Sequence, residues 1–291
     1  MTLAAERWPS YVEPAEGARA RPGTVVVWRL ELAKLSHLLR VRVIIVGCVI
    51  GPFVVVGGLK LTGATPGDTP FGIWTQTSGF AIPMLLLGAL AQYALPALTA
   101  VVAGDMFAGE DHFGTWKTIL TRSCGRGHFF VGKFLAAVTF AVVSMVLLTV
   151  FDLAAALLAG AHPVVGLGGQ LVPAGHATVL VIASYLSELP PLLGFTALAI
   201  FLSVVSRSII VGICGPVVIA VLLQIVSFIN LPASGQMALL STPFQAWHGF
   251  WADPAFYGPF RIGLLTSAVW FVVFAALSWL VFRRRTIGVA A

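Results

Sequence analysis

The sequence has 291 residues, of which 58% are hydrophobic and only 10% are charged. Soluble domains have about 45–50% apolar and about 25% charged residues, so this composition excludes a water-soluble or disordered chain. The fold class that it predicts is an all-α polytopic membrane protein, because the apolar runs are long and continuous rather than alternating as in a transmembrane barrel.

Two segments precede the first long apolar run. Residues 1–24 are polar and contain prolines, which predicts a loosely ordered cytoplasmic tail. Residues 25–42 carry basic side chains, and their large apolar residues recur at i, i+4, i+7 and i+11, namely Trp28, Leu32, Leu35 and Leu39. This pattern predicts an amphipathic helix that lies in the inner membrane interface, against the lipid headgroups.

Six apolar stretches follow, each long enough to cross a hydrocarbon core of about 30 Å as a helix. Helices are required because an open backbone in lipid would leave N–H and C=O groups unpaired. The predicted spans are 43–59, 80–104, 134–159, 177–206, 208–231 and 262–282. Together they define a six-span membrane domain over residues 43–285, which is followed by a short C-terminal tail, 286–291.

The basic residues are distributed unevenly between the two sides of this predicted domain. Of the 17 lysines and arginines, only Lys60 and Arg261 fall on the side opposite to the termini. Because cytoplasmic loops carry an excess of lysine and arginine, both termini are expected in the cytoplasm. The same bias accounts for the net charge of +6, so no nucleic-acid partner is expected.

A long insertion, residues 232–260, separates the fifth and sixth spans on the outer side. It is rich in proline and aromatic residues. Tryptophan is enriched at membrane–water interfaces, so Trp247 and Trp251 are expected in an outer interfacial cap. Because the insertion is too long for a minimal connection, it is expected to form short helices that dip back towards the membrane.

The cytoplasmic loop after the second span, residues 105–128, has the most specific sequence. It predicts a short amphipathic helix over 110–122, with Glu110 and Asp111 at its start and Arg122 near its end, where each charge opposes the nearby pole of the helix dipole. The apolar face of this helix is formed by Phe113, Trp116, Ile119 and Leu120.

This loop resembles the membrane subunits of type-2 ABC exporters. In that family an acidic residue is followed by Gly-Thr, an apolar pair, a Ser/Thr-rich turn, an arginine, and a Gly-Lys that enters the third span. The matching residues here are Glu110, Gly114-Thr115, Ile119-Leu120, Thr121, Arg126 and Gly132-Lys133. Two positions depart from the pattern, since Ser123-Cys124-Gly125 replaces a turn that often contains proline, and His112 replaces a frequent acidic residue.

The resemblance implies a permease that has no catalytic site of its own and no bound cofactor or metal. Two such subunits, identical or different, would pair with two ABC ATPase subunits that bind ATP and Mg²⁺. The residues implied in coupling to the ATPase are Glu110, Phe113, Gly114, Thr115, Trp116, Ile119 and Arg126. The sequence agrees in one respect, because no G-x-x-x-x-G-K-[ST] motif is present.

The substrate is expected to be hydrophobic or amphipathic, such as a drug, an antibiotic, a peptide or a lipid, because the spans are mainly apolar. The resemblance implies export. The Ala/Gly/Val-rich usage is typical of GC-rich bacterial genomes and predicts a bacterial cytoplasmic membrane as the site.

Two acidic residues fall inside predicted spans, where a charge is costly. Asp152 lies in the outer part of the third span, and Glu188 precedes Pro190-Pro191, which break the helix of the fourth. Each is either a substrate-path or gate residue or a locally hydrogen-bonded one. They also leave two alternatives open, a secondary carrier or membrane-embedded enzyme that uses Glu188 and Asp152, and a passive membrane assembly protein.

Overall fold

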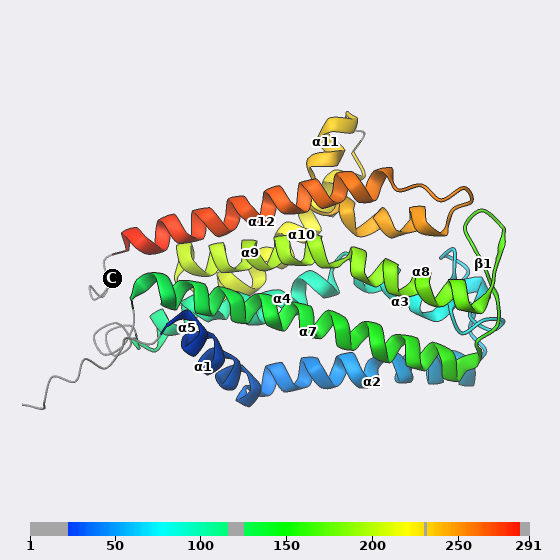
Figure 1. Cartoon of the computed structure of the whole chain (residues 1–291), viewed down its shortest axis with the longest axis horizontal. Coiled ribbons are helices and arrows are strands. Elements are labelled where there is room, and N and C mark those ends of the chain that lie inside the picture. Colours follow the sequence, from blue (N-terminus) through cyan, green and yellow to red (C-terminus); the bar gives the residue numbers. More distant parts are fainter. Residues whose placement is uncertain (1–22, 116–124, 230–231, 286–291) are drawn as a thin grey trace, which may run out of the picture.

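The computed structural model describes residues 23–115, 125–229 and 232–285, and within these the chain is almost entirely helical (Figure 1). The first half contains α1 Thr24–His37, α2 Leu39–Thr62, η1 Gly72–Trp74, α3 Ala81–Leu90, α4 Ala94–Ala103, α5 Asp105–His112 and α7 Arg126–Gly160. The second half contains β1 Val164–Val165, β2 Leu171–Val172, α8 Ala174–Ser187, α9 Leu189–Ser206, α10 Ile209–Ser227, α11 Ala233–Ala238, η2 Thr242–Trp251 and α12 Gly258–Arg284.

Among the described residues, five helical runs are long and apolar enough to cross a membrane. They are α2, α7, α8 with α9, α10 and α12. A sixth crossing is made if α3, α4 and α5 count as one span, which bends by 57°. The all-α polytopic class is therefore confirmed, with the second predicted span built from shorter helices.

Two of the crossings are interrupted, and prolines account for both interruptions. Pro96 has no N–H to donate to the carbonyl of Gln92, so helix α4 begins just after the break at residues 91–93. Pro190 and Pro191 likewise cannot donate to residues 186 and 187, and α8 ends at Ser187. The interruption at Glu188 is a single residue with helical backbone angles, so Ala174–Ser206 still forms one run of 33 residues.

The predicted interfacial helix over 25–42 is divided in the structure. Leu38 has an extended backbone, with φ −75° and ψ 125°, so α1 ends at His37 and the following residues belong to α2. Helix α1 also packs across α7, where Val27, Glu31 and Leu35 are buried. The segment is therefore a short helix held by protein on one face, followed by the start of the first span.

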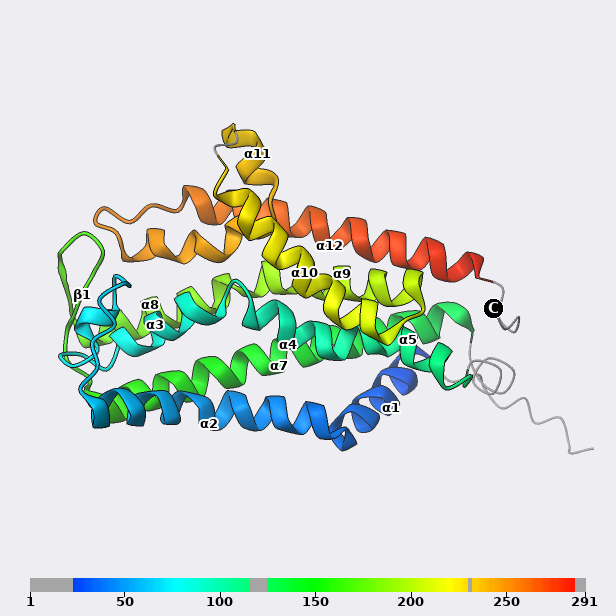
Figure 2. The ribbon, with the colours of Figure 1, turned by 180° about the vertical axis from the view of Figure 1, so that it is seen from behind.

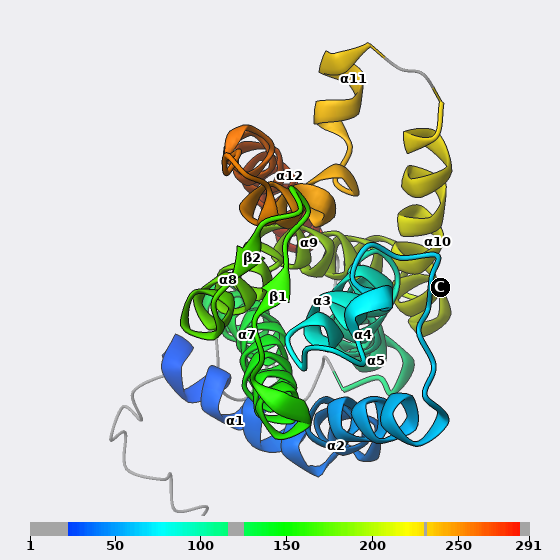
Figure 3. The ribbon, with the colours of Figure 1, turned by 90° about the vertical axis from the view of Figure 1, so that its right-hand side faces the viewer.

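The insertion before the last span contains the expected short helices, α11 and η2. Its two tryptophans are buried in the protein, because Trp247 packs on Phe71 and Trp251 donates its Nε1–H to Ser184 Oγ at 3.0 Å. Phe256 and Tyr257 are exposed. Helix α11 stands away from the bundle beyond α10 and α12 (Figure 3).

Both ends of the described chain lie at one end of the elongated bundle, together with α1, α5, the start of α7 and the last turn of α12 (Figures 1 and 2). Two contacts fix this arrangement. Thr24 Oγ1 lies 2.9 Å from His128 Nδ1, and Arg126 Nη1 donates to the carbonyl of Arg285 at 2.8 Å. We call this the basic end, because Lys34, Arg40, Lys133 and Arg283–Arg285 lie there.

Candidate functional site

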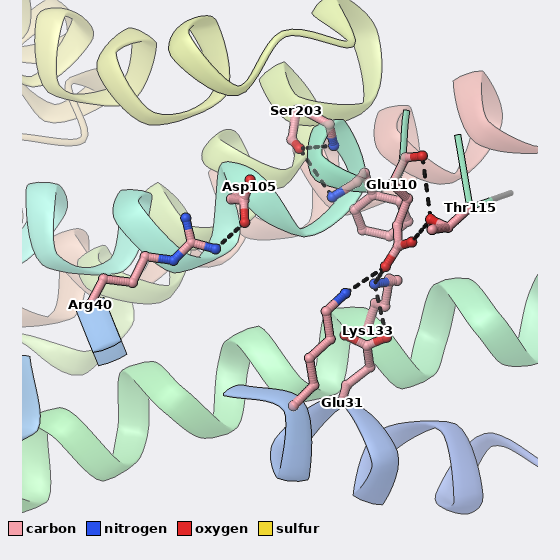
Figure 4. A network of polar contacts seen from close by, with 10 residues as sticks. Glu31, Arg40, Asp105, Glu110, Thr115, Lys133 and Ser203 are labelled. Atoms are coloured by element: carbon pink, nitrogen blue, oxygen red, sulfur yellow. Dashed lines mark hydrogen bonds and ion pairs between the residues drawn. The ribbon is translucent and has the colours of Figure 1, made fainter. Parts of the chain in front are cut away.

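Helix α5 lies at the basic end and is joined by polar side chains to the helices around it (Figure 4). At its start, Arg40 of α2 pairs with the Asp105 carboxylate. In its middle, the Ser203 hydroxyl of α9 accepts the backbone N–H groups of residues 107 and 108 at 3.3 and 2.9 Å. These contacts tie the first turns of α5 to α2 and α9.

The C-terminal turn of α5 carries Glu110, whose carboxylate is turned into the protein and is only 5% exposed. Its Oε1 atom lies 2.7 Å from Lys34 Nζ of α1 and 2.9 Å from Lys133 Nζ of α7. Its Oε2 atom accepts the Thr115 hydroxyl. Both carboxylate oxygens are therefore occupied by donors from this chain (Figure 4).

The Gly132-Lys133 pair of α7 explains how α1 and α5 come together. A Cβ on Gly132 would lie 2.6 Å from Val27 Cγ1, so the absence of a side chain allows α1 to approach α7. Lys133 is fully buried and its Nζ atom contacts two carboxylates, Glu31 of α1 and Glu110 of α5, each at 2.9 Å. A buried ammonium needs such partners, because an uncompensated buried charge is costly.

Lys34, on the exposed side of this network, is held in its charged form. Burial alone lowers its pKa, but the hydrogen bond to Glu110 and the nearby carboxylates outweigh burial and raise the pKa above the ordinary value for lysine. We call Glu31, Lys34, Glu110 and Lys133 the four-residue network.

A further ion pair joins α5 to the end of the last span. Arg285 Nη1 lies 3.0 Å from Asp111 Oδ2. Burial lowers the pKa of Arg285, and the Asp111 carboxylate opposes this effect. The acids at the C-terminal end of α5 face the unfavourable pole of its dipole, so these external cations offset a local destabilisation.

The predicted helix over 110–122 is not found in its first residues, and positions 116–122 lie outside the described residues. Glu110 and Asp111 lie in the last turn of α5, not in the first turn of a new helix. The chain leaves the helix at Phe113, and Gly114 has a φ of +64°, the left-handed conformation that commonly ends helices at glycine. Trp116 and Ile119 lie outside the described residues.

The sequence-predicted coupling residues therefore occupy different environments. Phe113 is 73% exposed and projects from the surface beside the buried Glu110. Thr115 is bonded to Glu110, and Arg126 caps the carbonyls of Arg283 and Arg285. Arg40, Asp105 and Ser203 were not singled out from the sequence. The sequence did hold a signal for Arg40 and Asp105, because each is a charged residue next to an apolar run.

A cleft of about 550 Å³ opens beside α5, between α1 and the start of α10. Its walls combine apolar residues such as Leu38, Met106 and Ile209 with the charged groups of Lys34 and Arg40. Helix α5 therefore has open space on one side, whereas its other sides are in contact with α2, α7 and α9.

The two acids inside the spans are both fully buried. The Tyr185 hydroxyl donates to Asp152 Oδ2, whereas Asp152 Oδ1 and both oxygens of Glu188 have no hydrogen-bond partner among the described residues. No group of three or more His, Cys, Asp or Glu side chains within the described ranges is arranged to hold a metal ion.

Comparison with known proteins places the chain in a family. A family model described as a protein of unknown function, DUF2705, matches residues 65–287. The chain belongs to this family. The match begins after α2 and continues through α12, so it includes α5, Lys133 and Arg285 but not Glu31, Lys34 or Arg40.

The chain is also similar to a probable ABC transporter permease protein, NosY, of Stutzerimonas stutzeri. The two are 30% identical over 108 residues, which is 37% of this chain and 37% of that protein. The similarity thus spans well under half of either protein. It supports a permease-like membrane protein, which is the coarser form of the resemblance found in the sequence.

Proposed function

We propose that this chain is the permease subunit of an ABC transporter and that α5, with the exposed turn at Phe113, transmits movement from a separate ATPase subunit to the spans. The similarity to a probable ABC transporter permease supports the class. The contacts of α5 support the role of this helix.

The observation that carries the proposal is the number of elements that one short helix joins. Asp105 contacts α2, Glu110 contacts α1 and α7, and Asp111 contacts the residue that follows α12. The Ser203 hydroxyl adds α9. A push on α5 is therefore delivered to several crossings at once, and the adjacent cleft leaves room for a shift.

Coupling requires an energy source outside the described fold. The ATPase subunits would bind ATP and Mg²⁺, and a second permease copy, identical or different, would complete the transporter. The bent crossing made by α3, α4 and α5 supports a switch between two packings, because a helix break can absorb the change in direction when rigid elements rotate.

The orientation in the proposal follows from charge. The basic end would face the cytoplasm of a bacterial cell, with both termini inside, because lysine and arginine are concentrated there. The direction would be export, and the substrate would be hydrophobic or amphipathic. In this assignment the chain itself is not an enzyme.

The test is reconstitution with an ABC ATPase encoded beside this gene. The two proteins, co-expressed and purified in nanodiscs, are expected to co-elute and to hydrolyse ATP faster than the ATPase alone. Transport by proteoliposomes that contain this chain alone, driven by a pH gradient without ATP, would instead support a secondary carrier and contradict the proposal.

A further inference from the structure

Two carboxylates lie inside the bundle without a cationic partner. Asp152 of α7 and Glu188, between α8 and α9, are each 0% exposed. Neither oxygen of Glu188 has a hydrogen-bond partner among the described residues, and Asp152 Oδ1 has none either. These groups contrast with Glu110, whose oxygens are all occupied.

The sequence supplies no internal cation for them. There is no lysine or arginine in 61–116, 134–206, 208–260 or 262–282, so these side chains occur only towards the ends of the crossings. An ionised carboxylate in an apolar interior is strongly destabilised unless a cation or several hydrogen bonds accompany it. When these two acids are ionised, no lysine or arginine lies in the same stretch, residues 134–206, to balance them.

Tyr185 contacts Asp152, and Glu188 lies one helical turn further along the same helical run. The Tyr185 hydroxyl donates to Asp152 Oδ2 and lies 3.1 Å from the carbonyl oxygen of Pro83 in α3. Glu188 follows three residues later, and residues three apart in a helical turn share a face. The site thus combines α3, α7 and the end of α8.

The site is placed where two crossings are interrupted. The α3–α5 crossing and the α8–α9 crossing contact each other at two points, Tyr185 with Pro83 and Ser203 with an amide of α5. Along the sequence, the break at 91–93 and the interruption at Glu188 each fall between these two contacts. Figures 1 and 2 show both breaks in the middle part of the bundle. Broken helices that meet inside a membrane are typical of transporter binding sites.

The surroundings select the kind of cation. Tyr185 belongs to an apolar cluster with Leu87, Leu192, Phe195 and Trp247. Aromatic and aliphatic groups suit the body of an organic molecule, and aromatic faces also attract cations. A metal ion would need more oxygen or nitrogen ligands, and the described residues offer no group of three.

We propose that Glu188 and Asp152 bind the positively charged group of an apolar organic cation, which is the substrate class of this permease. The proposal deepens the transport function proposed above and rests on it for its biological meaning. Binding itself requires no ATPase, so it is tested separately.

The experiment measures equilibrium binding of radiolabelled tetraphenylphosphonium to the purified full chain in nanodiscs. The wild type and Asp68→Asn, which removes an exposed acid at the far end, are expected to bind equally. Glu188→Gln and Asp152→Asn are each expected to weaken binding at least tenfold. Neutral triphenylphosphine oxide and excess Na⁺ are expected not to compete.

A second measurement needs no variant. Dicyclohexylcarbodiimide modifies carboxyl groups in apolar surroundings, and mass spectrometry of peptides locates the product. Tetraphenylphosphonium is expected to slow modification of Glu188 and Asp152 in the wild type. Absence of saturable binding, equal binding by both variants, competition by Na⁺ or lack of protection would each overturn the proposal. Co-elution with an ATPase is unaffected by any of these results, so failure of the two proposals is distinguishable.

Discussion

The Nζ atom of Lys133 lies 2.9 Å from Oε1 of Glu110, and this contact joins the third crossing to α5 inside the protein. The same Nζ atom also lies 2.9 Å from Oε1 of Glu31, so the ammonium group of α7 contacts carboxylates of both α1 and α5.

The first prediction concerns this pair. Removing one partner of a buried ion pair costs about 3–5 kcal/mol, because the other charge stays buried. Lys133→Met is therefore expected to lower the free energy of unfolding by about 3 kcal/mol, measured by denaturant titration in detergent. Glu110→Gln should cost less, because Lys133 keeps Glu31, and the double variant should lose less than the sum.

Lys60→Met is the matched control, since Lys60 at the far end makes one long contact of 3.4 Å with a carbonyl oxygen. It should change stability by less than about 0.5 kcal/mol. Equal effects of Lys60→Met and Lys133→Met would show that the four-residue network does not hold the helices together.

The second prediction concerns the crossing of α10 with the α4–α5 junction. A Cβ on Gly212 would lie 2.2 Å from the carbonyl oxygen of Gly104, so the two backbones touch. Gly212→Ala should destabilise the protein by about 1–3 kcal/mol, because a backbone atom cannot move aside as a side chain can. Thermal unfolding followed by tryptophan fluorescence measures the shift.

Gly47→Ala in α2 provides the comparison, because a Cβ there has no atom within 4 Å. Its midpoint should match or slightly exceed that of the wild type, since alanine favours helix over glycine. A larger loss for Gly47→Ala than for Gly212→Ala would contradict the packing described.

The third prediction concerns the exposed turn. Phe113→Ala should leave the fold intact, since the ring is 73% exposed, but should weaken association with the ATPase about tenfold, as expected for an aromatic anchor worth roughly 1.4 kcal/mol. Titration of ATPase stimulation measures the change. Leu61→Ala, which removes a side chain that is 90% exposed at the far end, is the control. Identical titrations for both variants would remove Phe113 from the interface.

The fourth prediction concerns orientation. In a background without native cysteines, Ser36→Cys lies at the basic end and Asp68→Cys at the far end, and both positions are exposed. A membrane-impermeant maleimide added to intact cells should label Asp68→Cys alone. Labelling of Ser36→Cys in intact cells would place the basic end outside.

The crossings could be predicted from the sequence because composition and length fix them in lipid. The interruption at Glu188 could be predicted as well, since two adjacent prolines remove amide donors whatever the surroundings. By contrast, the break at residues 91–93 was not predicted, because a single proline such as Pro96 near the start of a helix is compatible with a straight span.

The inward direction of Glu110 could not be predicted, because it depends on Lys34 and Lys133 from distant parts of the chain. A surface helix was the expected setting for an acid next to Asp111 and His112. The left-handed turn at Gly114 was also missed, although glycine after a charged helical segment is a known stop signal. Trp247 and Trp251 were placed at the membrane surface by residue type alone, and their burial follows from partners such as Phe71 and Ser184.

The contact between Asp111 and Arg285 has a consequence for the order of assembly. An eight-residue helix is too short to be stable by itself in water, so α5 depends on neighbours for its shape. One of these neighbours is synthesised after every other described residue. The helix proposed to receive force therefore gains this ion pair only after the last crossing has been synthesised.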